Sequence, residues 1–414
     1  MSAYQPRLLD ATLDTLLPTL PAVCVEGARG VGKTATLARR AGARWELDRP
    51  EQFTAVKADP DLVHLGERPV FIDEWQRVPS VWDSVRRAVD QHPGHGGQFL
   101  LAGSTVPINA PFHSGAGRVV TLTMRPLSLA ERQLDAPTAS LGQLLSGARA
   151  PISGRTAVAL TDYIEEILAS GLPGIRPLPD RARRAQLDAY LRQVMERDWD
   201  NASGRPREVA LFRRWATAYA AATATVCTFE KIRDAAGEQS EPPSRLTATR
   251  YRDALERLWL LDAVPGWIPG RNQLRRVGAM PKHYLVDPAF SARLLGVNRE
   301  GLLRDGPLLG RMFESLVVLS VRSYAEVNEA RISHLRTHDG RREVDLIVER
   351  DDGCILAIEV KLGQSVSDDD VAGLHWLRDT LGEIVADTVV INTGSLAYRR
   401  PDGIAVVPAA LLGV

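Results

Sequence analysis

A glycine-rich loop near the N-terminus constrains the fold of this chain more than any other feature. The loop reads Gly27-Ala28-Arg29-Gly30-Val31-Gly32-Lys33-Thr34. Its glycines let consecutive backbone N–H groups turn inward around phosphates, Lys33 reaches the β- and γ-phosphate oxygens, and the Thr34 hydroxyl ligates Mg²⁺. The apolar residues 21–26 precede the loop and the helix-like residues 34–40 follow it. This context predicts a buried strand, a phosphate-binding loop and a helix N-terminus facing phosphate, so we expect binding of ATP or GTP.

A second apolar run, residues 69–74, ends in the adjacent acids Asp73 and Glu74 about 40 residues after the loop. In phosphoryl transfer, Asp73 would hold Mg²⁺ through water and Glu74 would orient or activate the attacking water. A third strand-like run, residues 98–104, ends in Ser104. In a parallel sheet Ser104 would lie beside Asp73 and sense the γ-phosphate; the alternative is a serine that caps the following loop.

Composition bounds the class of protein. A length of 414 residues predicts two or three domains, and 44% hydrophobic with 25% charged residues is typical of a folded protein. The formal net charge of +0 gives no argument for a nucleic-acid or membrane partner. Three widely spaced cysteines form no metal-ligand pattern, and no apolar run reaches membrane-spanning length. We therefore expect a cytoplasmic protein with no membrane partner.

The C-terminal part contains two strand-like runs separated by a turn. Residues 343–349 and 354–361 flank the polar residues 351–353, a pattern that predicts a β-hairpin. If residues 351–353 form the loop, Arg350 pairs with Cys354. The same register sets every other pair of the hairpin.

That register places two carboxylates and a lysine on one face. Asp345 lies opposite Glu359, with Cβ atoms roughly 5 Å apart, and Lys361 points to the same side. Such a group can hold Mg²⁺ or Mn²⁺ and stabilise an attacking hydroxide. Glu314 lies upstream in the otherwise apolar helical run 308–327, where a buried carboxylate is costly unless it binds a metal or a partner.

The middle of the chain is mostly helical in periodicity. Residues 228–232 and 246–261 together resemble a winged-helix arrangement. Arginines at positions 245, 250, 252 and 257 could contact DNA phosphates, while leucines in the same helix indicate that it also packs a core.

These motifs, taken in order, resemble bacterial AAA-type ATPases. The segments that carry the resemblance are residues 25–34, 72–79, 101–105 and 117–119. The group resembled carries a C-terminal domain of unknown function, numbered 4143, often with a nuclease-like fold. The resemblance runs over nearly the whole chain and favours ATP over GTP.

The resemblance implies a modular α/β protein with four segments. Residues 1–135 would be a P-loop AAA-type core with a five-stranded parallel sheet, and residues 136–203 a linker and helical lid. Residues 204–282 would form a winged-helix-like domain. Residues 283–414 would form a restriction-endonuclease-like domain.

The resemblance also implies further site residues. Gly171-Leu172-Pro173 resembles a Gly-x-Pro turn that borders the nucleotide base, with a plain helix stop as the alternative. Arg118 could act on the γ-phosphate of a neighbouring subunit as an arginine finger, with a solvated arginine as the alternative. Related ATPases commonly form rings, so a homo-oligomer is implied.

The order Glu314, Asp345, Glu359-x-Lys361 looks like the PD-(D/E)xK nuclease core. This likeness implies a Mg²⁺ or Mn²⁺ site with Glu314, Asp345 and Glu359 as ligands and Lys361 as a catalytic residue, and DNA as a candidate partner. Some relatives of the fold bind nucleic acid without cutting it.

Three functions fit these features to different degrees. The first is Mg²⁺-dependent ATP hydrolysis that controls a C-terminal nuclease. The second is an ATP-dependent switch or scaffold whose catalytically inactive C-terminal domain only binds DNA or protein. The third, a small-molecule kinase, leaves Glu74, Ser104 and the C-terminal half without a role.

Overall fold

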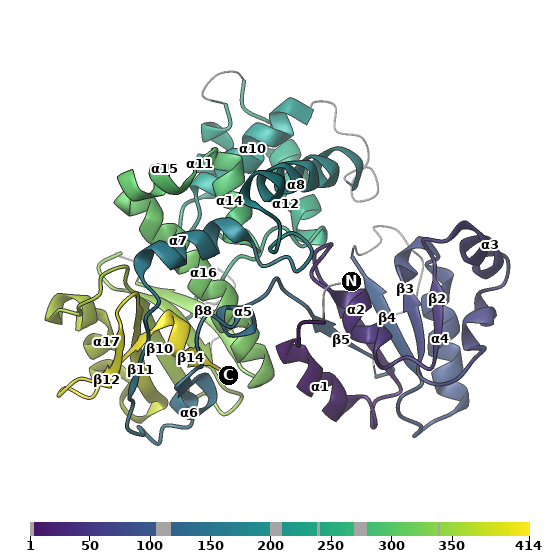
Figure 1. Ribbon diagram of the computed structural model, residues 1–414, viewed down its shortest axis with the longest axis horizontal. Helices are drawn as coiled ribbons and strands as arrows, with labels where there is room; N and C mark the ends of the chain where they lie inside the picture. The colour runs from purple at the N-terminus through teal and green to yellow at the C-terminus, as the bar shows by residue number, and fades with distance from the viewer. Residues whose placement is uncertain (1–3, 105–116, 199–208, 238–240, 269–279, 338–339) are drawn as a thin grey trace.

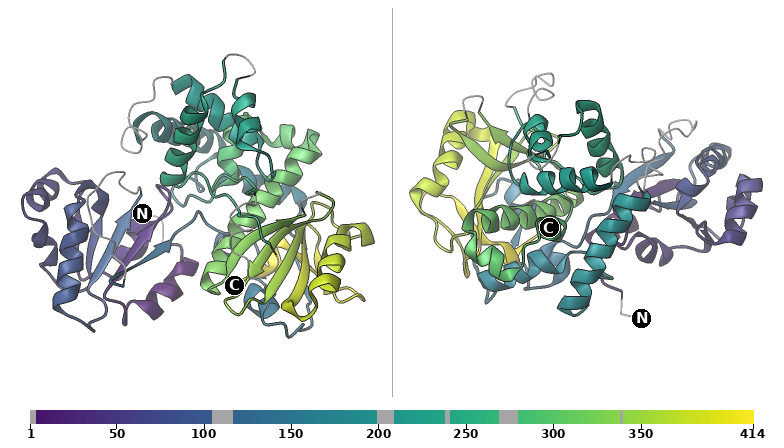
Figure 2. Two further views of the ribbon diagram at one scale, coloured as in Figure 1. Left: turned by 180° about the vertical axis from the view of Figure 1, so that it is seen from behind. Right: turned by 90° about the horizontal axis from the view of Figure 1, so that it is seen from above.

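The computed structural model describes residues 4–104, 117–198, 209–237, 241–268, 280–337 and 340–414. These residues form an N-terminal α/β lobe, a helical lobe and a C-terminal α/β lobe (Figures 1 and 2). Within the described stretches, no helix combines the length and the apolarity needed to cross a bilayer.

The N-terminal lobe is built on a parallel sheet of order β2-β3-β4-β1-β5. Its strands are β1 (Ala22–Glu26), β2 (Ala43–Glu46), β3 (Val70–Asp73), β4 (Phe99–Gly103) and β5 (Val119–Thr123). The inner strands β1, β3 and β4 are nearly continuous apolar runs because helices cover both of their faces. The expected five-stranded parallel sheet is confirmed.

The helices of this lobe divide between the two faces of the sheet. They are α1 (Leu8–Leu16), α2 (Lys33–Ala38), α3 (Pro50–Ala58) and α4 (Ser80–Gln91), with the 3₁₀ turns η1 (Pro60–His64) and η2 (Trp75–Arg77). Leu13 of α1 and Leu37 of α2 share a buried cluster with Val23. Val85 of α4 shares a different cluster with Cys24, the next residue of the same strand. Alternate β1 side chains therefore bind opposite helical layers.

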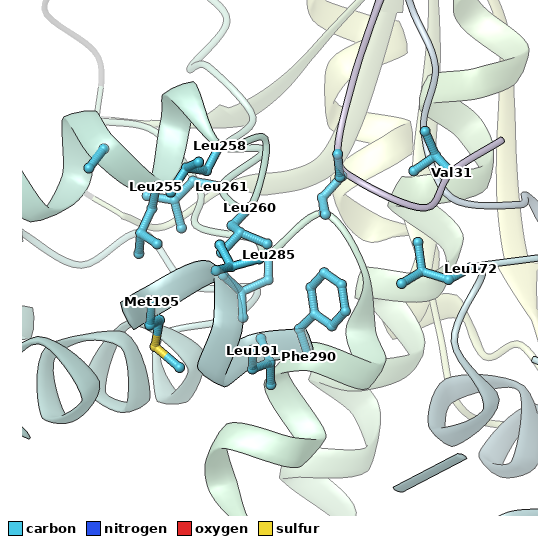
Figure 3. Close-up of a cluster of buried hydrophobic side chains, with 14 of the residues drawn as sticks. Val31, Leu172, Leu191, Met195, Leu255, Leu258, Leu260, Leu261, Leu285 and Phe290 are labelled. Carbon is cyan, nitrogen blue, oxygen red and sulfur yellow. The ribbon is translucent and has the colours of Figure 1, made fainter. Parts of the chain in front are cut away.

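The helical lobe lies between the two α/β lobes in the chain. Its elements are α7 (Leu160–Ala169), α8 (Asp180–Gln193), the π-helical turn η3 (Val194–Asp198), α10 (Val209–Ala221), α11 (Phe229–Ala235), α12 (Arg245–Arg257), α14 (Pro288–Leu295) and α15 (Arg299–Arg304). One buried cluster reaches from Val31 and Leu172 beside the glycine-rich loop to Leu191, Leu255 and Phe290 (Figure 3). The lobe thus shares a core with the loop.

A seven-stranded mixed sheet forms the centre of the C-terminal lobe, in the order β7-β12-β13-β11-β10-β9-β8. Its strands are β7 (Gly154–Arg155), β8 (Arg331–Arg336), β9 (Glu343–Glu349), β10 (Ile355–Val360), β11 (Val385–Asn392), β12 (Leu396–Arg399) and β13 (Ala405–Pro408). A separate two-stranded sheet pairs β6 (Ala139–Ser140) with β14 (Leu412–Gly413). The helices are α5 (Leu129–Arg132), α6 (Leu141–Leu145), α16 (Gly306–Val327) and α17 (Asp368–Leu381), with η4 (Gly382–Ile384) and η5 (Ala409–Leu411). Residues of α16 pack on one face of this sheet and residues of α17 on the other.

Two segments lie in other lobes than those expected from the sequence. Strands β6 and β7 lie within the expected linker and lid, residues 136–203, yet they pair with β14 and β12 of the C-terminal lobe. Strands of two residues carry no periodicity that a sequence could reveal. Helix α14 lies within the expected C-terminal domain, residues 283–414, but its Phe290 belongs to the core of the helical lobe.

The winged-helix arrangement remains a prediction. Helices α11 and α12 follow one another, and short antiparallel bridges join Leu261 to Leu285 and Val264 to Lys282. Part of the intervening segment, residues 269–279, lies outside the described residues.

Candidate functional site: a nucleotide site and a carboxylate cluster

The glycine-rich loop lies between the end of β1 and the start of α2, as the sequence predicts. Gly27, Gly30 and Gly32 have φ values of 149°, 77° and 108°, a region that L side chains rarely adopt. A Cβ atom on Gly27 would come within 2.1 Å of the Met124 carbonyl oxygen. Only glycine therefore fits at position 27, where the loop passes close to the chain that follows β5.

Lys33 is buried within its own loop, with 7% of its surface exposed. Its ammonium group donates to the carbonyl oxygens of Gly27, at 2.7 Å, and Ala28, at 2.9 Å. Burial lowers the pKa of Lys33 to about 8. The positive charge is therefore held by neutral dipoles and remains available to an anion.

A hydroxyl–carboxylate pair lies next to this lysine. The Thr34 hydroxyl donates to a carboxylate oxygen of Asp73 at 2.8 Å. Burial, together with the neighbouring charge of Glu74, raises the pKa of Asp73 to about 6. Hard oxygen donors of this kind suit Mg²⁺, which prefers one or two protein oxygens plus substrate phosphate. Thr34 and Asp73 therefore fit the Mg²⁺ that the sequence implies.

Glu74 has a left-handed backbone conformation, with φ 54°, at the end of β3. Its Oε2 accepts a hydrogen bond from the Ser104 hydroxyl at 3.1 Å and another from the Gln76 amide. The Gln76 amide also lies 3.3 Å from the Ser104 hydroxyl. Ser104 therefore contacts Glu74 rather than Asp73, and Gln76 is a site residue that sequence reasoning missed.

A cavity of about 660 Å³ opens beside the loop, within the range of small-molecule sites. It is lined by Tyr4, Gln5, Arg7, Gly32, Ala35, Thr36, Arg39, Glu165, Glu166, Ala169, Pro173, Arg176, Pro177 and Arg183. Pro173 thus faces the same space as Gly32 and α2. Gly171 instead fixes the backbone, because its N–H donates to Asp287 at 2.7 Å and its carbonyl accepts from Leu127 at 2.8 Å.

Arg118 lies away from the nucleotide site of its own chain. It precedes β5, which runs parallel to β1, whereas the glycine-rich loop follows the opposite end of β1. The exposed Arg118 side chain forms an ion pair with Asp90 at 2.9 Å. Arg118 could contact only a nucleotide bound to another subunit, so the arginine-finger role remains a prediction.

The C-terminal hairpin has the register that the sequence predicts. Glu349 pairs with Ile355, and Leu346 pairs with Ile358. The next pair in this register is Asp345 with Glu359. Asp345 also accepts a hydrogen bond from the backbone N–H of Val360 at 2.9 Å.

Asp345 also lies close to Glu314, and the two acids share a lysine that the sequence analysis did not single out. The Lys282 ammonium group is 2.7 Å from Glu314, 2.8 Å from Asp345 and 3.3 Å from Glu343, measured to a carboxylate oxygen in each case. Only 2% of Lys282 is exposed. Burial alone would lower its pKa, but the surrounding negative charges, Asp345 first among them, raise it well above its ordinary value.

Two carboxylates of the cluster, Glu314 and Glu359, have raised pKa values. Burial and the charge of Asp345 raise the pKa of Glu314 to about 7 and that of Glu359 to about 8. Tyr284 donates a hydrogen bond of 2.5 Å to Glu314. Lys361 pairs with Glu359 at 3.0 Å, so it shares the face expected for it.

The expected C-terminal metal site needs correction. Glu314, Asp345 and Glu359 converge as predicted, but the Lys282 ammonium group bridges the first two. Among the residues that the structure describes, no group of three or more His, Cys, Asp or Glu side chains is arranged to hold a metal. The position between Glu314 and Asp345 is filled by the chain's own cation.

Comparison with known protein families divides the chain into three matched regions. Residues 20–133 match an AAA domain, residues 160–301 match a domain of unknown function, DUF8612, and residues 309–412 match another, DUF4143. The chain therefore has an N-terminal AAA domain, which implies ATP and Mg²⁺ as ligands, and a DUF4143 domain at its C-terminal end.

Whole-chain relatives are distant. An uncharacterized protein of Mycobacterium tuberculosis and one of Mycobacterium bovis are each 25% identical over 410 residues, covering 96% of this chain and 82% of theirs. Among solved structures, a Walker-type ATPase of Pyrococcus abyssi is 15% identical, covers 69% of this chain and 94% of its own, and has a TM-score of 0.40.

Proposed function

We propose that this protein is a Mg²⁺-dependent ATPase. The observation that carries the proposal is the Thr34–Asp73 hydrogen bond of 2.8 Å, directly beside Glu74. It brings together, from the loop and from β3, the oxygen donors for Mg²⁺ and a carboxylate for the attacking water. The AAA domain matched over residues 20–133 supports the same chemistry.

Each site residue has a distinct task in this proposal. Lys33 and the loop N–H groups would bind the β- and γ-phosphates, and Thr34 and Asp73 would hold the Mg²⁺ whose charge offsets that of the phosphates. Glu74 positions the attacking water and accepts its proton. Ser104 and Gln76, which bond to Glu74, set the direction of that carboxylate.

The decisive experiment separates binding from hydrolysis. We expect Lys33→Ala to lose ATP binding. The loop contains two charged residues, Arg29 and Lys33, and the variant removes the one assigned to the phosphates. Glu74→Gln should keep ATP binding within about threefold but lose hydrolysis by roughly 10²–10⁴-fold, the range for a general base. Calorimetry and phosphate release measure the two effects.

A matched control is Glu51→Gln, which neutralises an exposed acid in the same lobe. It should leave both binding and hydrolysis unchanged. Undiminished hydrolysis by Glu74→Gln would overturn the role of Glu74. ATP binding that survives Lys33→Ala at full affinity would overturn the nucleotide site itself.

We further propose that the nucleotide state controls the C-terminal domain through Arg7 and Arg125. Arg7 donates to the Val31 carbonyl in the glycine-rich loop, at 2.5 Å, and to the Arg125 carbonyl, at 2.7 Å. The Arg125 side chain then pairs with Asp262, at 2.9 Å, and with Glu326 of α16, at 2.7 Å. A continuous series of ion pairs and hydrogen bonds thus supports coupling between the loop and α16.

For the C-terminal domain, the bridging position of Lys282 favours the second hypothesis from the sequence over an active nuclease. The domain would then act by binding DNA or protein. The exposed Arg245 and Arg250 of α12 are the candidate DNA contacts. If the Arg245→Ala, Arg250→Ala double variant no longer shifts DNA in a mobility-shift assay, DNA is supported as the partner. A homo-oligomer with Arg118 at the subunit boundary remains part of the proposal.

A further inference from the structure

We propose that Lys282 is the resident cation of the C-terminal carboxylate cluster and takes the place of a divalent metal. The cluster is defined as Glu314, Asp345, Glu359 and Lys361 with Lys282 at its centre. Its carboxylates resemble a metal-dependent nuclease site, yet two of them, Glu314 and Asp345, are bridged by an ammonium group from a different segment of the chain. The inference concerns the C-terminal domain and does not depend on the proposed ATPase activity.

The distances support an ammonium group as a structural partner. Lys282 lies 2.7 Å from Glu314 and 2.8 Å from Asp345, the separations of charge-assisted hydrogen bonds. A third carboxylate, Glu343, lies at 3.3 Å, so three acids surround the three N–H donors of the lysine. Pairing with carboxylates offsets the cost of burying the lysine charge.

The backbone that carries Lys282 is also fixed. Its N–H donates to the Val264 carbonyl at 2.9 Å, and its carbonyl accepts from the Val264 N–H at 2.9 Å. Two residues further on, Tyr284 donates to Glu314 and accepts at its carbonyl from Asp262. The position of Lys282 is therefore fixed, because its backbone N–H and its carbonyl are both hydrogen-bonded to Val264.

A divalent cation and Lys282 exclude one another. Mg²⁺ requires oxygen ligands at roughly 2.0–2.1 Å in an octahedron, and the ammonium group lies between two of the oxygens it would need. A cation that entered beside Lys282 would meet like charge at short range in a buried site, where repulsion is strong. Lys282 must leave before a metal can bind.

The test measures Mn²⁺ binding directly, by the spin-resonance signal of free Mn²⁺ during titration of the full chain. Every protein carries Asp73→Asn, which removes a metal ligand of the nucleotide site, and no nucleotide is added. We expect the protein with Lys282 to show the same weak Mn²⁺ binding with and without Asp345→Asn. A site in the Lys282 protein that Asp345→Asn removes would overturn the proposal.

The second arm replaces the lysine. Lys282→Met keeps an unbranched side chain, one atom shorter and without charge, and should create a Mn²⁺ site roughly tenfold tighter or more, in the range by which neighbouring groups tune metal affinity. Asp345→Asn should abolish the new site. Lys231→Met, at an exposed lysine, is the matched control and should create none. A folded Lys282→Met protein without a new site would contradict the proposal, and if that variant does not fold, the comparison at Asp345 decides.

Discussion

The nucleotide site and the carboxylate cluster are assembled from the same kinds of residue but hold their lysines in opposite ways. Lys33 and Lys282 are both buried, at 7% and 2% exposure. Lys33 bonds to carbonyl oxygens of its own loop, whereas Lys282 bonds to carboxylates from α16 and β9. Accordingly, burial lowers the pKa of Lys33 to about 8, while the pKa of Lys282 is raised.

If Lys282 has the structural role proposed above, a lysine beside acids is not by itself a mark of catalysis. Neutral dipoles orient the Lys33 charge without cancelling it, so an incoming phosphate can use that charge. Carboxylates neutralise the Lys282 charge within the fold, so that charge is not available to an incoming anion. The partner of the lysine, rather than its burial, separates the two roles.

The largest effects should come from removing each lysine in turn. Lys282→Ala leaves Glu314 and Asp345 buried without their cation and should cost about 3–5 kcal/mol of unfolding free energy. Lys33→Ala removes only bonds to carbonyl oxygens and should cost about 1 kcal/mol, while it abolishes ATP binding. Urea unfolding measures the free energy of unfolding of both variants, and ATP titration measures their ATP affinity.

The relative stability of Lys33→Ala and Lys282→Ala tests whether the two lysines differ in role. If Lys33→Ala is the more strongly destabilised protein, the charge of Lys33 is structural after all. Lys57→Ala, at an exposed lysine of the N-terminal lobe, controls for the loss of a lysine and should change stability by less than about 0.5 kcal/mol.

A smaller effect is expected where the two regions are joined. Arg125 and Glu326 form an ion pair of 2.7 Å that is largely buried on the arginine side. A double-mutant cycle with Arg125→Met and Glu326→Gln should give a coupling energy of about 0.5–3 kcal/mol. Hydrogen exchange of α16 amides should respond to ATP in the natural chain and should not respond in Arg125→Met.

The surface pair Arg331–Asp351, at 3.3 Å, is the matched control for this cycle. Both of its side chains are exposed, so its coupling energy should be only about 0–1 kcal/mol. Equal coupling energies for the two pairs would remove Arg125 from the proposed connection between the lobes. An unchanged ATP response in Arg125→Met would do the same.

The positions of Lys33, Thr34, Asp73 and Glu74 follow from the sequence because each depends on local pattern. Residues 27–34 are contiguous, and Asp73 and Glu74 follow a strand whose place beside β4 is set by parallel pairing. The hairpin register is local for the same reason, since three turn residues determine that Asp345 faces Glu359. Short-range patterns therefore predict both strand-end groups of acids.

Lys282 could not be predicted in this way. It lies 32 residues before Glu314 and 63 before Asp345, and only tertiary packing brings it to them. The available signal was weak. Lysine is rare in this arginine-rich chain, and Lys282 precedes the largely apolar run His283-Tyr284-Leu285-Val286, where a charge needs a partner. The contact between Gln76 and Glu74 was missed because a glutamine after a strand has many possible partners.

The last prediction, the pH dependence of ATP binding, follows from the opposite pKa shifts of the two lysines. Phosphate binding requires the Lys33 ammonium form, and the pKa of about 8 in the free protein means that the group loses its proton above pH 8. The complex must then take up a proton, so the ATP dissociation constant should rise about tenfold between pH 7 and pH 9, or roughly 1.4 kcal/mol.

Lys33→Arg supplies the reference for this measurement, because arginine keeps its charge throughout the range and ATP itself titrates identically with both proteins. Calorimetry in buffers of different ionisation enthalpy should detect proton uptake near pH 8 in the natural chain and none in Lys33→Arg. The raised pKa of Lys282 keeps that lysine charged over the same interval, so Lys282→Met should retain the full slope. Equal slopes for the natural chain and Lys33→Arg would mean that Lys33 is charged throughout, and the contrast between carbonyl-held and carboxylate-held lysines would then rest on stability alone.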